Sequence, residues 1–220
     1  MWMSWLRSSA SFHPGWPVPI GPLRVQAGVV RLRPVRLRDA AVWSRIRLAD
    51  QAHLEPWEPV SGVDWRLRHG VSSWPAICSG LRGEARRGRM LPYVIELDGE
   101  FAGQLTIGNV THGALRSAWI GYWVASDKTG GGVATGALAL GLDHCFTGVQ
   151  LHRVEATVRP ENAASRAVLA RVGFREEGLL RRYLEVDGAW RDHLLVAVTL
   201  EELKHSASQA LVSAGRASWC

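Results

Sequence analysis

Residues 123–136 read WVASDKTGGGVATG, and this stretch decides the fold. An apolar run ends at Ala125, three consecutive glycines follow at 130–132, and a helical pattern of apolar residues starts directly after them. Glycines allow backbone N–H groups to converge, and a helix N-terminus adds about half a positive charge. The stretch therefore predicts a strand, a glycine turn and a helix whose first residues could bind phosphate.

Two common phosphate-binding loops do not fit this turn. In a Walker A loop a lysine and a hydroxyl residue follow the last glycine, but Ala137 and Leu138 follow Gly136 here. A dinucleotide fingerprint that began at Gly130 would require glycine at the place of Thr135. On this segment alone, a glycine-rich connection without a ligand stays open.

A second segment supplies the missing context. Residues 162–174 read NAASRAVLARVGF and follow a predicted strand at 154–158. Together the two segments resemble the GNAT acetyltransferase superfamily, whose acetyl-CoA loop reads [QR]-x-x-G-x-[GA] and whose next helix often starts with N-x-x-[AS] and ends in G-F. Thr129 stands at the Gln/Arg position, and Leu169 stands where a tyrosine acid is frequent. The positions that match are Gly132, Ala134, Asn162, Ser165, Gly173 and Phe174.

Two further stretches resemble the RimJ/RimL branch of this superfamily. Residues 53–59 read HLEPWEP, similar to an L-x-P-W-x-P loop of the branch, and residues 183–193 read YLEVDGAWRDH, similar to the end of RimJ-like chains. The resemblance covers residues 29–203. It implies a cytoplasmic N-acetyltransferase that uses acetyl-CoA and acts on the N-terminal alanine of a ribosomal protein, which could be one of the small subunit.

The resemblance also implies roles for single residues in acetyl-CoA binding. The backbone at Trp123 and Val124 would polarise the thioester carbonyl, because the strand at 120–125 would part from the strand at 154–158. Asn162 would bond the pantetheine arm. The pyrophosphate would contact the turn and the helix start, at Thr129, Gly130, Gly131, Gly132, Val133 and Ala134.

Acetyl transfer also needs a proton donor for the leaving thiolate and a base for the acceptor ammonium. The branch carries a serine at the motif position of Ser165, which makes Ser165 the first candidate acid and a cofactor contact. Tyr183 is the second candidate acid. Glu185 is the first candidate base, with Glu155 and Glu58 as rivals.

Loops of the branch would flank the acceptor amine, so we expect Trp57, Glu58 and Trp190 to contact the acceptor. His193 falls within a strand and is interpreted as structural. No His/Cys cluster has metal-ligand spacing, so we expect no metal. Two alternatives stay open: a GNAT enzyme that acetylates a small-molecule amine, and a non-catalytic acyl-CoA-binding or ribosome-associated module.

The apolar patterns along the chain follow the order β-α-α-β-β-β-α-β-α-β-β. This order favours an α/β (α+β) fold with a mixed, mainly antiparallel central sheet flanked by about four helices. Asp98-Gly99 and Asp187-Gly188 predict tight hairpin turns. We expect one GNAT domain over residues 28–204, an N-terminal tail at 1–27 and a C-terminal tail at 205–220.

The amino-acid composition excludes several classes of protein. Of the 220 residues 47% are hydrophobic, which excludes wholesale disorder. Three cysteines cannot form a disulfide framework and favour a reducing compartment, and no stretch is long and apolar enough for a membrane span. Residues 1–92 carry 14 basic and 6 acidic residues, so a weak contact of this part with ribosomal RNA is expected. Monomer and homodimer both stay open.

Overall fold

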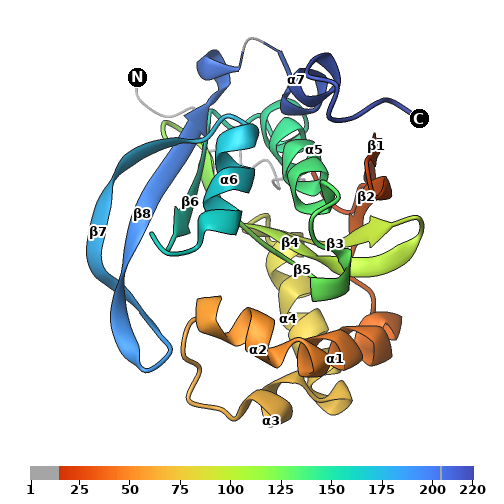
Figure 1. Cartoon of the computed structure of the whole chain (residues 1–220), viewed down its shortest axis with the longest axis vertical. Coiled ribbons are helices and arrows are strands. Elements are labelled where there is room, and N and C mark those ends of the chain that lie inside the picture. The colour runs from red at the N-terminus through yellow and green to blue at the C-terminus, as the bar shows by residue number, and fades with distance from the viewer. Residues whose placement is uncertain (1–14, 204) are drawn as a thin grey trace, which may run out of the picture.

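A computed structural model of the chain describes residues 15–203 and 205–220. A single sheet of eight strands runs through this part of the chain (Figure 1). The strands are β1 (Ile20–Val25), β2 (Gly28–Pro34), β3 (Met90–Leu97), β4 (Glu100–Thr111), β5 (Ser117–Val124), β6 (Arg153–Val158), β7 (Arg175–Val186) and β8 (Ala189–Thr199).

The strand order in the sheet is β1-β2-β3-β4-β5-β6-β8-β7. All neighbouring strands are antiparallel except β5 and β6, which are parallel. The predicted mixed, mainly antiparallel sheet is therefore confirmed. Asp98 and Asp187 have φ of 51° and 52°, and the glycines after them also have positive φ, as the two predicted hairpin turns require.

Helices cover both faces of the sheet, and the described residues hold seven of them instead of about four. The difference comes from short helices: the predicted helical stretch after Asp64 divides at Gly70 into two, and Pro75 lies in the first turn of the second, where its missing N–H costs nothing. The helices are α1 (Ala40–Ala49), α2 (Gln51–Leu54), α3 (Trp65–His69), α4 (Trp74–Arg86), α5 (Val133–Thr147), α6 (Ala163–Arg171) and α7 (Ala207–Ser213).

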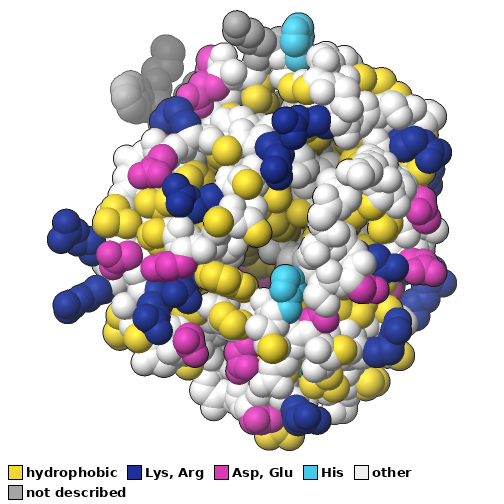
Figure 2. All heavy atoms as spheres, viewed as in Figure 1, with side chains coloured by type: hydrophobic (Ala, Val, Ile, Leu, Met, Phe, Trp, Pro, Cys, Tyr) yellow, Lys and Arg dark blue, Asp and Glu magenta, His cyan; other side chains and the backbone are white. Residues whose placement is uncertain are grey.

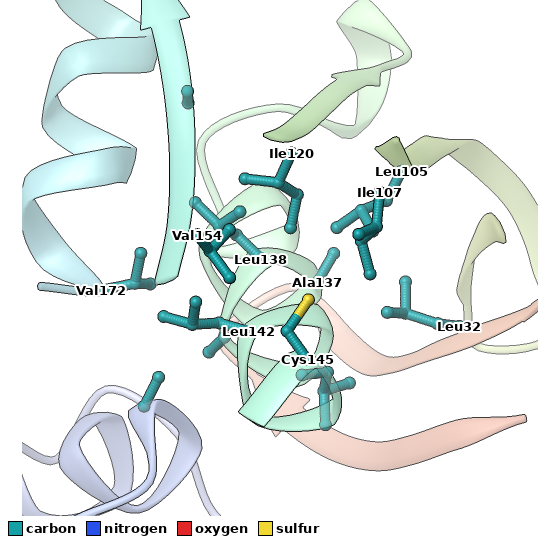
Figure 3. Packing of buried hydrophobic residues seen from close by; sticks show 14 of the residues in the cluster. Leu32, Leu105, Ile107, Ile120, Ala137, Leu138, Leu142, Cys145, Val154 and Val172 are labelled. Atoms are coloured by element: carbon teal, nitrogen blue, oxygen red, sulfur yellow. The ribbon is translucent and has the colours of Figure 1, made fainter. Parts of the chain in front are cut away.

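The larger core lies between the sheet and α5. Figure 3 shows Leu138, Leu142 and Cys145 of α5 among side chains of the strands, including Leu105 and Val154. The helix is apolar nearly all round because the sheet, α6 and α7 enclose it. Figure 1 shows α5, α6 and α7 together in one half of the molecule and α1 to α3 in the other.

A second, smaller core lies on the other face of the sheet. Trp43 of α1 and Trp74 of α4 meet with ring centroids 4.8 Å apart, and both are buried. They pack with Val94 of β3 and Phe101 of β4. The sheet is thus covered on both faces, and whatever binds to it must enter where strands separate. None of the described helices is long and apolar enough to cross a membrane.

The strands separate between β5 and β6. Their ladder runs only from Ser117 opposite Arg153 to Trp119 opposite Glu155. After that point β5 continues on β4, and β6 continues on β8 as far as Val158. The predicted parting of these two strands is confirmed, and it leaves the second half of β5 without a neighbour on one side.

The segments expected to be N-terminal and C-terminal tails contain a strand and a helix in the structure. The segment 20–25, inside the expected N-terminal tail, forms β1 at the sheet edge; residues 1–14 lie outside the described part. Arg24 of β1 exchanges two backbone hydrogen bonds of 2.9 Å with Ser218, inside the expected C-terminal tail. In α7, the N–H of Ala207 donates to the carboxylate of Asp143 on α5 (2.6 Å). Both segments therefore belong to the packed domain.

A buried ion pair joins β2 to the start of the helical layer, and it yields a stability prediction. Arg33 donates from both terminal nitrogens to Asp39 (2.8 and 2.9 Å) and from Nε to Glu96 (2.5 Å). D39A leaves the buried guanidinium with Glu96 as its one charged partner, so we expect the free energy of unfolding to fall by about 3 kcal/mol. Urea unfolding measures this loss. R31A removes an exposed arginine of the same strand and should change stability by less than about 0.5 kcal/mol; equal effects would contradict the assignment.

Candidate active site

A cleft of about 1640 Å³ occupies the place where β5 and β6 part. Its lining comes from β5, β6, the start of α5, one face of α6, the segment 53–59 and the strands β7 and β8. Figure 2 shows this face of the molecule hollowed near its centre, with hydrophobic side chains around the recess. The cleft is large enough for a cofactor-sized ligand together with a second substrate.

The glycine turn forms one end of the cleft. Gly130 and Gly132 have φ of 90° and 87°, a left-handed conformation that favours glycine, and both line the cleft. Within the described chain, the backbone N–H groups from Gly130 to Val133 donate to no protein acceptor. Such free N–H groups at a helix start suit an anionic ligand, so the turn fits a phosphate group.

Contacts from the β1–β2 turn and from the residue after α1 hold the glycine turn and the segment before it in place. The N–H of Ala27, in the turn between β1 and β2, donates to the carbonyl of Gly131 (2.9 Å). A Cβ on Gly131 would lie 2.5 Å from that of Ala27, so this glycine serves close packing and is not part of the cleft lining. From α1, the carboxylate of Asp50 accepts the N–H and the hydroxyl of Ser126 (2.7 and 2.6 Å).

Two hydroxyl groups meet where α6 faces β5. The hydroxyl of Tyr122 lies 3.0 Å from the Oγ of Ser165, and both residues line the cleft. Burial raises the pKa of Tyr122 to about 12, although the hydrogen bond with Ser165 acts in the opposite direction, so the phenol stays protonated at neutral pH. Asn162 begins α6, and its Oδ1 accepts the N–H of Ser165 (3.0 Å). Asn162 thereby fixes the position of the serine.

Tyr122 was not among the predicted site residues. The signal that could have identified it is the alternation of strand residues. Trp123 packs against the smaller core, so its neighbour Tyr122 must face the opposite side of the sheet, where α6 lies.

A glutamine on β4 is fixed by two indole groups. The Oε1 of Gln104 accepts from the Nε1 of Trp43 (3.0 Å) and from the Nε1 of Trp123 (3.2 Å). Because both acceptor contacts use the oxygen, the amide nitrogen is the group left for other partners, and Gln104 lines the cleft. The indole of Trp123 thus holds a neighbour in place, a role outside the predicted backbone contact of this residue.

Glu58 lies in the cleft wall, but two guanidinium groups already bind it. The Arg47 Nη2 is 2.5 Å from one carboxylate oxygen, and an Arg68 Nη is 3.3 Å from the other. Arg47 is only 3% exposed, stacks on Trp65 and also contacts the Nε2 of His69 (2.7 Å). Glu58 is therefore part of a buried charge network that sequence reasoning missed, because its members come from α1, from α3 and from the segment between α2 and α3.

The remaining predicted residues divide into two groups. Trp57 lines the cleft with the Arg159 guanidinium 5.2 Å from its ring centre, and Tyr183 and Glu155 also line it. Trp190 and Glu185 lie opposite each other near the end of the β7–β8 hairpin and are not part of the lining.

The other residues predicted for cofactor binding, apart from Gly131, are all part of the lining: Trp123, Val124, Thr129, Gly130, Gly132, Val133, Ala134, Asn162 and Ser165. In the described part of the chain, no three His, Cys, Asp or Glu side chains gather as a metal site would need.

Comparison with known proteins agrees with this geometry. Residues 30–175 match the acetyltransferase (GNAT) domain. RimJ of Mycobacterium smegmatis, solved in complex with CoA-disulfide, is 81% identical and covers 94% of this chain and 100% of that chain with a TM-score of 0.94. The [ribosomal protein uS5]-alanine N-acetyltransferase of Escherichia coli strain K12 is 32% identical over 189 residues, 83% of this chain and 92% of that protein. The ribosomal-protein-S5-alanine acetyltransferase of Vibrio fischeri is 26% identical, with a TM-score of 0.72 over 80% of this chain and 96% of that chain.

The network around Glu58 predicts a pH dependence of stability. His69 donates from Nδ1 to the Trp65 carbonyl (3.0 Å) and accepts from Arg47, so it is neutral when folded. Burial, helped by the charges of Arg47 and Arg68, lowers the pKa of His69 to about 4.

The unfolded chain takes up a proton on this histidine below pH 6.5 and the folded protein does so only near pH 4, so its contribution to stability is lost as pH falls through that interval. We expect stability to fall there with a slope of up to about 1.4 kcal/mol per pH unit from His69. In H69Q the slope between pH 6.5 and 4 should be shallower in urea unfolding. Identical slopes would contradict the neutral assignment.

Proposed function

Because the chain belongs to the GNAT acetyltransferase family and is an N-acetyltransferase, we propose that it transfers an acetyl group from acetyl-CoA to the α-amine of the N-terminal alanine of ribosomal protein uS5. The observation that carries the proposal is the cleft at the parting of β5 and β6. This cleft connects the glycine turn, which suits an anion, on one side of the sheet with an open groove on the other side. The named activity of the Escherichia coli relative supports the choice of acceptor.

The residues present fit acetyl-CoA. The free N–H groups at the start of α5 suit its pyrophosphate, and the unpaired edge of β5 beyond Trp119 suits the amides of the pantetheine arm. When bound, acetyl-CoA supplies the activated thioester. Backbone groups near Trp123 and Val124 would then hydrogen-bond its carbonyl oxygen, where negative charge develops during attack by the amine.

The charges of the cleft favour a peptide terminus over a polycationic small molecule. A polyamine would need free carboxylates for its further ammonium groups. Among the described lining residues the carboxylates are Glu58, Glu155 and Glu161, and each pairs with an arginine at 2.5 to 3.3 Å. A peptide needs only one deprotonated amine and an open groove. The compartment that fits this acceptor is the cytoplasm.

The hydroxyl pair at α6 supplies the proton for the leaving group. We propose that Ser165 protonates the CoA thiolate as the C–S bond breaks, with Tyr122 as its hydrogen-bond partner at 3.0 Å. Tyr122 is protonated at neutral pH, as tyrosines are, and burial raises its pKa further to about 12, so the phenol holds a proton for the hydrogen bond with Ser165. Tyr183 remains the second candidate acid, since it also lines the cleft.

The contact expected between the basic part of the chain and ribosomal RNA stays a prediction. The helical layer of residues 36–87 carries exposed arginines, such as Arg38 and Arg45 of η1 (Leu37–Asp39) and α1. We propose that this layer weakly favours the ribosome or its precursors, because rRNA presents phosphates.

Mass spectrometry of acetylated peptides tests the proposed acceptor. We expect peptides with the N-terminal sequence of uS5 to gain one acetyl group with acetyl-CoA. Peptides that start with serine or carry a blocked amine, and spermidine, should react at least about tenfold more slowly, which corresponds to about 1.4 kcal/mol of discrimination. Preferred acetylation of spermidine would favour the small-molecule alternative, and no acetylation of any amine would favour a binding module.

A second experiment tests the proton donor. Removing a general acid typically costs 10²-fold or more, so we expect S165A to lower kcat by about 100-fold and Y122F by about 10-fold. The affinity for CoA, measured by calorimetry, should change little in Y122F, because Phe keeps the buried ring. If Y183F lowers kcat more than S165A does, Tyr183 is the acid instead.

A further inference from the structure

The three carboxylates predicted as candidate bases either pair with arginines or lie outside the cleft lining. Glu58 binds two arginines, and Glu155 binds Arg153 at 3.1 Å. The nearest charged groups to these two carboxylates are therefore guanidinium groups of the protein itself. Glu185 is exposed and does not line the cleft. The cleft therefore needs another proton acceptor.

We propose that His193 of β8 is this proton acceptor, which deepens the function proposed above and rests on it. Its side chain is only 4% exposed, and it lines the cleft. The sequence pattern alone had indicated a structural histidine. The reassignment depends on the geometry of the two ring nitrogens.

The hydrogen bond of one ring nitrogen fixes the state of the other. Nδ1 of His193 lies 3.1 Å from the carbonyl oxygen of Arg191. A carbonyl oxygen only accepts, so Nδ1 carries the hydrogen and donates it. In the neutral ring the lone pair is then on Nε2. Within the described residues Nε2 contacts no hydrogen-bonding group, which leaves it available to a substrate amine.

The position of His193 in the sheet places it on the acceptor side. Its neighbour Leu194 pairs with Val158 at the end of β6 and belongs to the core under α5. Because strand residues alternate, His193 and Leu195 face the opposite side, and both line the cleft. Tyr183 packs edge-on against the imidazole with ring centres 5.6 Å apart and holds its orientation.

Several titratable or charged groups share this part of the cleft with His193. They come from the strands on either side, from α2 and α3, and from the segment between these two helices. They are Tyr183 on β7, Glu155 on β6, and Glu58, Arg68 and His53. The two glutamates are paired with arginines at 2.5 and 3.1 Å, whereas Nε2 of His193 has no partner among the described residues.

The proton balance of the step is complete without a further reactant. The ammonium N–H bond breaks, its electron pair stays on nitrogen, and Nε2 of His193 gains the proton that later passes to water. The neutral amine then forms the C–N bond with the thioester carbon. As the C–S bond breaks, sulfur takes the electron pair and a proton from Ser165, and the second amine proton returns to the hydroxyl pair through solvent.

The test compares H193N with the wild type at two pH values. Asparagine keeps a donor near the Arg191 carbonyl and removes Nε2. At pH 7 we expect kcat/KM for the alanine peptide to fall about 10-fold, because only about a tenth of an α-amine with a pKa of about 7.7–8.0 is neutral in solution at that pH. At pH 9 the deficit should shrink to less than about 2-fold, because the amine is then neutral in solution and needs no base. CoA affinity and the thermal midpoint should stay near wild type.

H152N is the matched control, since His152 is half-buried and lies outside the cleft lining; it should keep wild-type kinetics. Should H193N not fold, H193Q takes its place. Wild-type kcat/KM of the folded variant at pH 7, or a deficit of equal size at both pH values, would overturn the proposal. If the wild type acetylates only another amine, the proposed acceptor fails, and the same comparison on that amine still tests His193.

Discussion

The parallel pairing of β5 and β6 ends after three residue pairs, and the site depends on this interruption. Each strand is held away from the other by its second neighbour. On β4, Gly103 packs so closely on β5 that a Cβ would lie 2.1 Å from the carbonyl oxygen of Trp123. On the other side, β6 follows β8 through six register pairs. The opening is therefore built into two well-paired half-sheets and needs no movement to form.

Contacts that cross the sheet connect the two sides of this opening. Asp50, at the end of α1, binds Ser126 in the connection from β5 to the glycine turn. Trp123 extends from the parting strand into the smaller core and contacts Gln104 and the Arg47 guanidinium, which is 5.1 Å from its ring centre. The helical layer that holds the Arg47–Glu58 network thus also fixes the connection to the loop that suits the pyrophosphate. A displacement of α1 would therefore shift residues at both ends of the cleft.

Much of the fold and part of the site could be predicted from the sequence, because local patterns encode them. Turn residues, alternation and the glycine run predict the strands, the hairpins and the start of α5. The strand β1 could not be predicted, because its proline- and glycine-containing sequence forms a strand only when β2 lies beside it. The network of Arg47, Glu58 and His69 brings together residues 11 to 22 positions apart, and only tertiary packing reveals it. The place of Glu185 at the end of a predicted strand suggests a position near the cleft, but the residue is not part of the cleft lining.

The proposed acid and the proposed base lie on opposite faces of the sheet. Tyr122 and Ser165 meet on the face covered by α5 and α6, whereas His193 projects from β8 to the other face. A direct hydrogen bond between an acid and a base in one small site would fix the proton between them and weaken both for catalysis. In this protein the backbone and the reacting groups lie between the acid and the base. The gap between β5 and β6 connects the two faces of the sheet. The amine can therefore lose its proton on one face while the sulfur gains one on the other, which explains why the chemistry requires a sheet that parts and not merely a surface groove.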